Sequence, residues 1–439
     1  MLNRNPNLAR LKAGYLFPEI ARRRREFAAA HPEDPARPET RIISLGVGNT
    51  TEPILPHTCR GLTEGARGLG TAEGYSGYQD EGLPELRRRI SAVFYRPLGR
   101  DAAADRDAEN GLPGGTVRGE PFSAEEIFIS DGAKCDIGRL QLLFGAGTRV
   151  AVQDPSYPVY VDGSVLIGAA GDWTEDAAAG RAGYGGITYL PCTAENGCFP
   201  DLSQLPEHSL FYFCSPNNPT GAAATEEQLT ELVAAARKKG CLIVFDAAYA
   251  EYIRDPALPK TIYAIQGSRE CAIEVKSFSK PAGFTGVRLG WTVVPRELTY
   301  AGGESVNADW GRVMGTIFNG ASNIAQAGGL AALSPEGLTE VRRLCDFYLG
   351  NAALIRAALR KLGISRVGGD NSPYVWARFP GRDSWEVFAE ILERCRVVTT
   401  PGAGFGPAGQ SFIRFSAFGH RSDVEEACRR LALMDPASG

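Results

Sequence analysis

The sequence has 439 residues, of which 44% are apolar and 22% are charged, and its formal net charge is −4. This length and composition are ordinary for a globular protein of two domains, or of one large domain with a smaller companion. The slightly acidic balance excludes attraction to nucleic acid or to an anionic membrane through a general positive charge, and the apolar runs are too short to span a bilayer.

Cysteine and histidine usage favours a reducing compartment and argues against a metal centre. The ten cysteines are scattered, and no CxxC pair occurs among them. Scattered cysteines inside apolar runs are typical of reduced, buried thiols. There are four histidines and no HExxH motif, so we expect no metal. The N-terminal segment lacks the apolar core of a secretory signal. We therefore expect a cytoplasmic location.

The N-terminal part of the chain predicts an arm and a helix within residues 1–40, which ends where three prolines lie between positions 32 and 38. A short strand at Arg41–Leu45 then leads into a turn with two glycines, where the backbone is able to approach a ligand closely. A helix is expected at Leu83–Tyr95. Two stretches, Gly99–Glu120 and Gly171–Gly186, have the Ala-, Asp- and Gly-rich composition of surface insertions.

Between and after these insertions, short apolar strands alternate with amphipathic helices such as Ala133–Phe144 and Thr225–Lys239. The expected strands are Glu126–Ser130, Arg149–Gln153, Ile187–Leu190, Leu210–Cys214, Cys241–Asp246, Cys271–Val275 and Leu289–Val294. This alternation predicts an α/β domain with a mostly parallel seven-stranded sheet flanked by helices. In such sheets ligands bind beyond the carboxyl ends of the strands.

The C-terminal part predicts a smaller α/β domain. A long helix near Leu338–Leu362 precedes strands near Tyr374–Phe379, Val397–Thr400 and Phe412–Ser416. We expect an arm and helix over 1–40 that pack with the small domain or a dimer partner. We expect a large domain over 41–310 and a small domain over 311–439.

Lys280 is the first candidate for chemistry. It lies just past an expected buried strand in the run Ser277-Phe278-Ser279-Lys280, with Arg288 eight residues later. A desolvated lysine has a lowered pKa and forms a Schiff base with an aldehyde. The serine hydroxyls and the arginine are suited to a phosphate. The ordinary alternative is a lysine that faces solvent at the end of a strand.

Further candidates follow the ends of other expected strands. Asp246 ends an apolar run, with Tyr249 three residues on, and Asn218 lies in the turn Ser215–Gly221. A carboxylate at a buried strand end needs a cation or a donor, and a protonated pyridinium nitrogen is such a partner. Tyr249 is then placed to reach the ring's phenolic oxygen. The alternative for Asp246 is hydrogen bonding to neighbouring backbone amides.

Three more segments add a phosphate site, an aromatic ring suited to stacking and an arginine suited to binding a carboxylate. Ala133 and Lys134 open a helix after a glycine, where free amides bind phosphate. Tyr157 lies between two prolines and is suited to stacking on an aromatic ring. Arg414 lies inside an apolar strand without an acidic neighbour in sequence, which suits a substrate carboxylate. Together these features predict a site for pyridoxal 5'-phosphate.

The motifs SPNNPTG, DAAY and SFSK, with an arginine eight residues after the lysine, resemble the aspartate-aminotransferase-like (fold type I) family of pyridoxal-phosphate enzymes. More narrowly, the chain resembles the LL-diaminopimelate aminotransferases. The narrower resemblance covers nearly all of the chain outside the two insertions, and its motifs are LKAGYLFPEI, LGVGNTTEP, YSGY, FISDGAK, QDPSYPVY, FNGAS, TPGAGFG and FIRFSAFGHR.

The resemblance implies an aminotransferase of lysine and diaminopimelate biosynthesis, with roles for residues that match the family's motifs. It implies catalytic roles for Lys280, Asp246 and Tyr249. The implied cofactor-binding residues are Ala133, Lys134, Tyr157, Asn218, Asp246, Tyr249, Ser277, Ser279, Lys280 and Arg288, with Tyr78 from a neighbouring subunit. The implied substrate-binding residues are Tyr15, Gly48, Glu81, Lys134, Tyr157, Asn218, Asn319 and Arg414. A homodimer that acts on amino acids and 2-oxo acids follows from the same resemblance.

Three departures from the family pattern bear on the substrate. The loop Gly77–Gly82 is one residue shorter than usual, so either Glu81 or Asp80 is the acid expected to read a distal ammonium. Asn49 replaces a carboxylate, and the Gly99–Glu120 insertion is long. A different amino acid, or a cyclisation or elimination with the same cofactor, therefore stays open. A ligand-sensing regulator is disfavoured because Lys280 is intact and the first 40 residues are too few for a DNA-binding domain.

Overall fold

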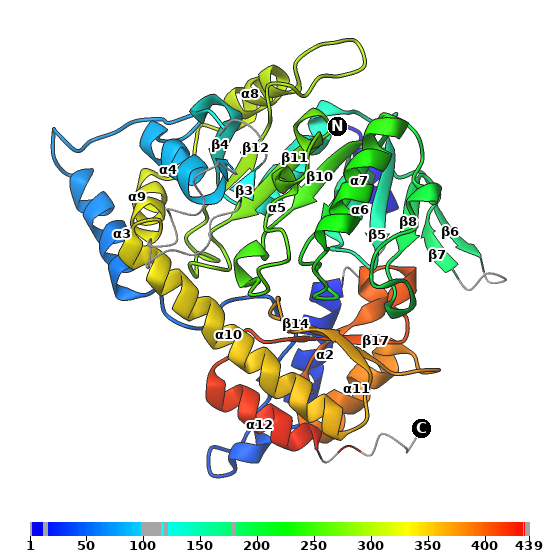
Figure 1. The fold of residues 1–439 in the computed structure, drawn as a ribbon. Coiled ribbons are helices and arrows are strands. Elements are labelled where there is room, and N and C mark those ends of the chain that lie inside the picture. Colours follow the sequence, from blue (N-terminus) through cyan, green and yellow to red (C-terminus); the bar gives the residue numbers. More distant parts are fainter. Residues whose placement is uncertain are drawn as a thin grey trace.

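The computed structural model describes residues 2–11, 16–97, 116–117, 122–176, 181–432 and 434. Its larger part is built on a seven-stranded sheet with the order β4-β12-β11-β10-β9-β5-β8 (Figure 1). The strands are β4 Ile127–Ser130, β5 Arg149–Asp154, β8 Ile187–Pro191, β9 Ser209–Cys214, β10 Leu242–Asp246, β11 Ala272–Ser277 and β12 Gly290–Val293. The strand β12 pairs antiparallel with both β11 and β4, and all other strand pairs in this sheet are parallel. All seven strand predictions are confirmed.

Alternate side chains of these strands enter two hydrophobic clusters on opposite faces of the sheet. In β10, for example, Ile243 and Phe245 belong to one cluster and Val244 belongs to the other. Because side chains point alternately to either face of a strand, a strand covered on both faces is apolar throughout. This arrangement explains why the strands are recognisable in the sequence as continuous apolar runs.

Helices cover both faces of the sheet (Figure 1). One cluster is completed by α4 Pro84–Phe94, α7 Glu226–Lys239 and α9 Asn323–Ala332, and the other by α5 Ala133–Leu140, α6 Val159–Leu166 and α8 Val306–Ile317. Helix α3, Pro56–Gly68, packs against α9. The short α1, Asn7–Arg10, packs against α6. None of the described helices combines the length and apolar character that a membrane span requires.

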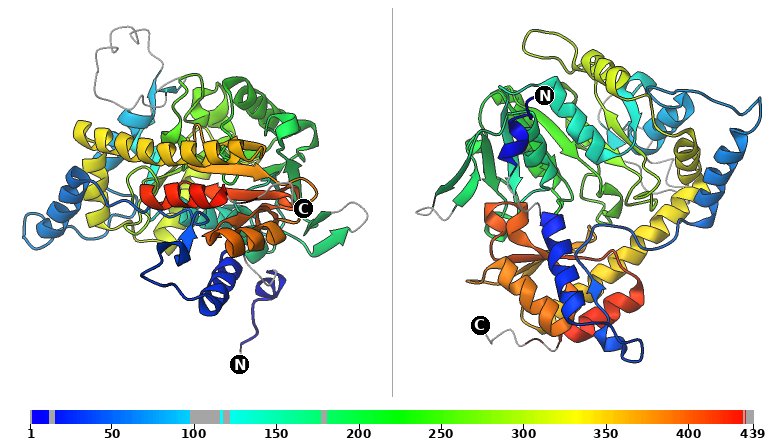
Figure 2. Two further views of the ribbon diagram at one scale, coloured as in Figure 1. Left: turned by 90° about the horizontal axis from the view of Figure 1, so that it is seen from below. Right: turned by 180° about the vertical axis from the view of Figure 1, so that it is seen from behind.

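The smaller part has a four-stranded sheet with the order β13-β14-β17-β16. Its strands are β13 Arg366–Gly368, β14 Tyr374–Arg378, β16 Thr400–Pro401 and β17 Phe412–Ser416. Figure 2 shows α12, Arg421–Leu431, alongside the long α10, Pro335–Lys361. A third hydrophobic cluster forms the core of this smaller part, and the helices α2, Leu16–Ala30, and α11, Ser384–Cys395, contribute side chains to it. The predicted small α/β domain is confirmed.

The expected domain boundaries are wrong at both ends. The strand β1, Ile43–Ser44, pairs in parallel with β15, Val397–Val398, and its side chains belong to the small domain's cluster. At the other end, α8 and α9 pack onto the large sheet, so the large domain continues past residue 310. The change occurs inside α10, where Tyr348 belongs to the large core and Ala352 to the small one. A continuous helix carries no compositional break, and so this boundary left no mark in the sequence.

The two insertions join the large domain at its periphery. Most of Gly99–Glu120 lies outside the described residues, although β2 Arg96–Pro97 and β3 Thr116–Val117 pair in parallel. Within the second insertion, β6 Trp173–Asp176 and β7 Arg181–Tyr184 form an antiparallel hairpin that projects from the domain (Figure 1). Neither strand pair belongs to the seven-stranded sheet, and β7 contacts the turn Pro407–Gly409 of the smaller part.

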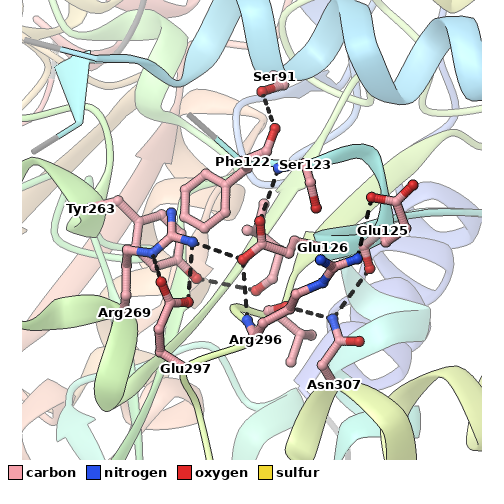
Figure 3. Close-up of polar contacts among 12 residues, drawn as sticks. Ser91, Phe122, Ser123, Glu125, Glu126, Tyr263, Arg269, Arg296, Glu297 and Asn307 are labelled. Carbon is pink, nitrogen blue, oxygen red and sulfur yellow. Dashed lines mark hydrogen bonds and ion pairs between the residues drawn. The ribbon is translucent and has the colours of Figure 1, made fainter. Parts of the chain in front are cut away.

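A polar cluster anchors the chain where the first insertion returns to the core (Figure 3). The buried Glu126 accepts hydrogen bonds from Ser123 N at 2.9 Å, Arg269 Nη2 at 2.8 Å and Arg296 N at 3.1 Å. The Arg269 guanidinium also lies 4.2 Å from the ring centre of Phe122. These contacts compensate the cost of burying a carboxylate and hold β4 in place.

Candidate active site

A cavity of about 530 Å³ lies where the carboxyl ends of the large sheet's strands meet the small domain. Most residues that the sequence singled out line it, namely Gly48, Ala133, Lys134, Tyr157, Asn218, Asp246, Tyr249, Ser277, Ser279, Lys280, Arg288 and Arg414. They come from the carboxyl ends of β4, β5, β9, β10 and β11 and the segments that follow them, from the segment after β1, and from the small-domain strand β17. The cavity thus lies at the edge of the sheet where ligands bind in parallel α/β sheets.

Lys280 is positioned three residues past the end of β11 and points into the cavity. Its Nζ donates a hydrogen bond to the carbonyl oxygen of Gly48. Burial, and then the positive charges of Arg414 and Arg288, lower the pKa of Lys280 to about 8. An amine whose pKa is lowered in this way, and which forms no ion pair with a described carboxylate, loses its proton more readily and so is available as a nucleophile and as a proton carrier.

Asp246 ends β10 and is buried in the cavity wall. Its Oδ2 accepts a hydrogen bond of 2.7 Å from the Tyr160 hydroxyl, and its Oδ1 accepts one of 3.0 Å from the backbone N–H of Ala248. Burial raises the pKa of Asp246, while these two donors oppose that rise. No described cation pairs with the carboxylate, and the protonated ring nitrogen of pyridoxal phosphate would be such a partner.

The same cavity is also lined by the donors of a phosphate site. Helix α5 begins at Ala133, and its first amides have no partner inside the helix. Arg288 Nη1 donates to Ser279 Oγ at 3.1 Å, and the hydroxyls of Ser277 and Ser279 lie 2.8 Å apart. Gly132 has φ +123°, and a Cβ there would collide with the Arg288 guanidinium. Only glycine allows this close approach.

A pair of tyrosines crosses the cavity from one domain to the other. The Tyr249 hydroxyl, on the large domain, lies 2.8 Å from the Tyr374 hydroxyl, on β14. Tyr157 lines the same cavity, with its ring edge-on to Tyr160 at 5.8 Å between centroids. Both hydroxyls of the pair are buried, which raises the pKa of Tyr249 and of Tyr374. They are neutral donors at physiological pH.

Arg414 projects from β17 and is fully buried. It donates from Nη1 to Asn218 Oδ1 at 2.7 Å and from Nη2 to the carbonyl oxygen of Gly46 at 2.6 Å. Its Nε is buried without a hydrogen-bond partner, and no described carboxylate pairs with the guanidinium. An unpaired buried cation that faces a cavity calls for an anionic ligand.

These observations fit pyridoxal phosphate and an amino-acid substrate. The unpartnered Nε of Arg414, the unpaired carboxylate of Asp246 and the donor set around Arg288 each lack a ligand of the kind that the cofactor and a substrate carboxylate provide. Within the described residues, no group of three or more histidine, cysteine, aspartate or glutamate side chains is placed to hold a metal ion.

Some expected site residues do not line this cavity. The side chain of Tyr78 is 81% exposed, and Asn319 is also exposed. Glu81 forms an ion pair of 2.7 Å with Arg87. The segments that carry Tyr78 and Asn319 lie together, because Asn323 Nδ2 donates to the carbonyl oxygens of residues 76 and 77. Tyr15 lies outside the described residues.

Sequence reasoning missed several residues of the site. The structure adds Tyr374 and Thr285 to the cavity lining, together with Phe17, Val47, Cys135, Ile137 and Ala248, and it adds Tyr160 as the partner of Asp246. Tyr160 follows Tyr157 by three residues, so helical spacing offered a signal for it. For Tyr374 no local signal existed, because it is a tyrosine at the start of an apolar strand.

Comparisons with known proteins agree with this geometry. A model of the family described as aminotransferase class I and II matches residues 40–431. The chain is 52% identical over 429 residues to the probable LL-diaminopimelate aminotransferase, chloroplastic, of Oryza sativa subsp. japonica, covering 98% of this chain and 85% of that protein. It is 50% identical over 430 residues to the LL-diaminopimelate aminotransferase, chloroplastic, of Arabidopsis thaliana, covering 98% and 86%. The solved structure of L,L-diaminopimelate aminotransferase from Chlamydomonas reinhardtii is 53% identical, covers 98% of each chain and has a TM-score of 0.86.

Proposed function

The chain belongs to the aminotransferase class I and II family of pyridoxal-phosphate enzymes, and from that membership we propose that it interconverts LL-2,6-diaminopimelate plus 2-oxoglutarate with tetrahydrodipicolinate plus glutamate. This reaction serves the biosynthesis of diaminopimelate and lysine. The single observation that carries the substrate class is the buried Arg414, which has an unpartnered Nε beside Lys280 in one cavity. The relatives' names supply the particular amino acid.

The residues of this chain divide the work of transamination. When bound, pyridoxal phosphate supplies an electron sink that stabilises negative charge at the substrate's α-carbon. Asp246 would keep the ring nitrogen of the bound cofactor protonated, and the donors near Arg288 would hold its phosphate. Lys280 Nζ would hold the cofactor and would move the proton at the α-carbon, for which a pKa of about 8 is well matched to neutral conditions. Arg414 would hold the α-carboxylate.

We also propose that the enzyme is a homodimer in which Tyr78 serves the neighbouring subunit's site. The proposal is supported by the exposure of Tyr75 and Tyr78 and by their position away from the chain's own cavity. Asn319 and Glu81, on the same surface, are proposed to contribute to substrate binding across that interface. Tyr15 is proposed to bind substrate from the N-terminal arm.

Mixing two inactive variants tests the shared site. A heterodimer of Lys280→Ala and Tyr78→Phe retains one intact site only if Tyr78 acts across the interface, so activity should return on mixing. If Tyr78 acts within its own chain, every site stays defective and no activity returns. Light scattering measures the subunit number independently.

A cytoplasmic location is a further proposal, supported by the scattered, unpaired cysteines. The names of the rice and Arabidopsis relatives describe those two proteins as chloroplastic. Fractionation of the source cells, followed by detection of the protein in each fraction, tests the proposal.

The substrate assignment is tested by incubating purified protein with LL-diaminopimelate and 2-oxoglutarate while glutamate is measured. We expect glutamate to form with this donor and to form far more slowly with aspartate or an aromatic amino acid. A protein that bears the cofactor but forms no glutamate from LL-diaminopimelate would favour the alternative, namely another amino acid or a cyclisation or elimination. The shortened loop Gly77–Gly82 is the feature that favours this alternative.

A further inference from the structure

We propose that Tyr374 is a positioning residue for the cofactor's ring oxygen and acts through Tyr249. In this arrangement the Tyr374 hydroxyl donates a hydrogen bond to the Tyr249 oxygen. The Tyr249 hydroxyl is then free to donate its own hydrogen bond to the ring oxygen. The proposal rests on the cofactor site and does not depend on which amino acid is the substrate. It assigns a role to a small-domain residue that no sequence motif marks.

Tyr374 has a fixed place between the two domains. It begins β14 and is buried, opposite Ser416 of β17 in the small sheet. Its ring lies edge-on to that of Tyr249, with centroids 5.1 Å apart and an interplanar angle of 68°. The Arg414 guanidinium lies 4.5 Å from the centre of the Tyr374 ring. These contacts leave its hydroxyl directed at Tyr249, 2.8 Å away.

The backbone of the segment after β1 also approaches this hydroxyl closely. A Cβ at Gly48 would collide with the Tyr374 hydroxyl oxygen, so the site has space for the hydroxyl only because residue 48 is glycine. The carbonyl of the same glycine accepts the hydrogen bond from Lys280. Tyr374 therefore packs against the segment that orients the catalytic lysine.

Counting protons decides the direction of the bond between the two tyrosines. Each tyrosine has one hydroxyl proton, and either hydroxyl is able to donate at this distance. Among the described residues, neither hydroxyl has another hydrogen-bond partner. When Tyr249 donates to the ring oxygen, its proton is used, and so the bond between the tyrosines requires the proton of Tyr374. A phenylalanine at 374 would leave the Tyr249 oxygen without a donor.

This chain of donors has an electronic consequence. A hydroxyl that accepts a hydrogen bond becomes a stronger donor, because each bond in a chain polarises the next. A stronger donor stabilises negative charge on the ring oxygen and lowers the pH at which the bound cofactor loses its proton. The visible absorption of the bound cofactor reports that pH directly, without turnover.

The experiment is a pH titration of the visible absorption of cofactor-loaded protein, without substrate, in four forms: wild type, Tyr374→Phe, Tyr249→Phe and the double variant. We expect Tyr249→Phe to give the largest rise in apparent pKa and Tyr374→Phe a rise of about half a pH unit, the size of one modest hydrogen bond. Because Tyr374 acts through Tyr249, the double variant should titrate like Tyr249→Phe alone. The dissociation constant of pyridoxal phosphate should rise about two- to threefold in Tyr374→Phe.

Tyr348→Phe is the matched control. Tyr348 is a buried tyrosine of the same aromatic cluster, 4.8 Å from Phe418, and its hydroxyl accepts from the amides of Thr51 and Glu52 but does not contact Tyr249. Its titration should match that of the wild type. No shift in Tyr374→Phe, additive shifts in the double variant, or an equal shift in Tyr348→Phe would each overturn the proposal. A wrong substrate assignment would leave all four titrations unchanged.

Discussion

Asn218 Oδ1 accepts a hydrogen bond of 2.7 Å from Arg414 Nη1, which joins a turn of the large domain to a strand of the small domain. The contact holds the planar guanidinium in one orientation, with Gly46 as a second acceptor. An oriented guanidinium offers two parallel donors to a carboxylate, whereas an ammonium offers a single charge. The two domains must therefore be in place before the substrate carboxylate is bound.

We accordingly expect Arg414→Lys to raise the KM for every amino-acid substrate by about tenfold or more, with a smaller change in kcat. The loss of one charged hydrogen bond is worth about 1.5–3 kcal/mol. Steady-state kinetics with LL-diaminopimelate and glutamate measure the effect. Arg378→Lys, at the exposed end of β14, is the control and should leave both KM values unchanged. A change confined to kcat would remove Arg414 from carboxylate binding.

Lys280 is expected to be the residue that carries the cofactor. Borohydride treatment of the loaded protein should fix the cofactor's mass on the peptide that contains Lys280, because the pKa of this amine is lowered and the amine faces the cavity. Lys280→Ala should still bind pyridoxal phosphate but should not turn over. Peptide mass spectrometry checks the assignment. Labelling of another lysine, for example Lys276, would contradict it.

The lowered pKa of Lys280 also predicts how the stability of the cofactor-free protein depends on pH. Below pH 8 both states carry the ammonium, and the folded state bears the full cost of its burial. Between pH 8 and 10.5 the unfolded chain binds more protons than the folded one, so the free energy of unfolding rises with pH. Removing the amine should therefore raise the free energy of unfolding of the cofactor-free protein at pH 7.

We expect cofactor-free Lys280→Met to exceed the wild type in free energy of unfolding by about 2–3 kcal/mol at pH 7, and by much less near pH 10.5. Urea unfolding at the two pH values measures the difference. Lys238→Met, on the exposed side of α7, removes an ammonium in contact with water and should show no such pH dependence. A constant advantage of Lys280→Met at both pH values would mean that packing, rather than charge, explains it.

Asp246→Ala should lower kcat by two to three orders of magnitude. Without the carboxylate, the ring nitrogen loses its proton and the ring accepts negative charge poorly. The size of the loss is taken from comparable electrostatic groups in active sites, about 3–4 kcal/mol. Single-turnover kinetics with glutamate check the step that depends on the α-carbon proton. Turnover near that of the wild type would exclude Asp246 from the mechanism.

Glu81 tests the distal end of the substrate. Its carboxylate is 52% exposed and pairs with the buried Arg87. If Glu81 also binds the far ammonium across a dimer interface, Glu81→Gln should lower kcat/KM for LL-diaminopimelate by a factor that corresponds to about 2–3 kcal/mol. The kcat/KM for glutamate should be nearly unchanged. Equal losses with both substrates would mean that Glu81 only supports the loop through Arg87. Asp80→Asn, at the neighbouring exposed acid, tests the alternative reader by the same ratio.

The sequence by itself determined the elements and the chemistry of the cavity's large-domain wall. Strands buried on both faces are apolar throughout, so β10 was recognisable, and the aspartate that ends it was recognisable as an anomaly. Lys280 was identifiable for the same reason, because a polar residue past a buried strand has few ordinary partners. Local sequence patterns were enough to predict this wall, because a parallel sheet brings the carboxyl ends of its strands to one edge whatever their order.

Only the tertiary structure decided which side chains form hydrogen bonds with one another at that edge of the sheet. Tyr374 meets Tyr249 from 125 residues away, and Tyr160 meets Asp246 from 86 residues away. Burial alone marks these tyrosines as core residues, and nothing in their neighbours distinguishes a hydroxyl that has a partner from one that has none. The domain boundary inside α10 was hidden in the same way. A hydrogen bond extends about 3 Å and depends on where distant segments pack, whereas a sequence pattern records only which face of an element is apolar.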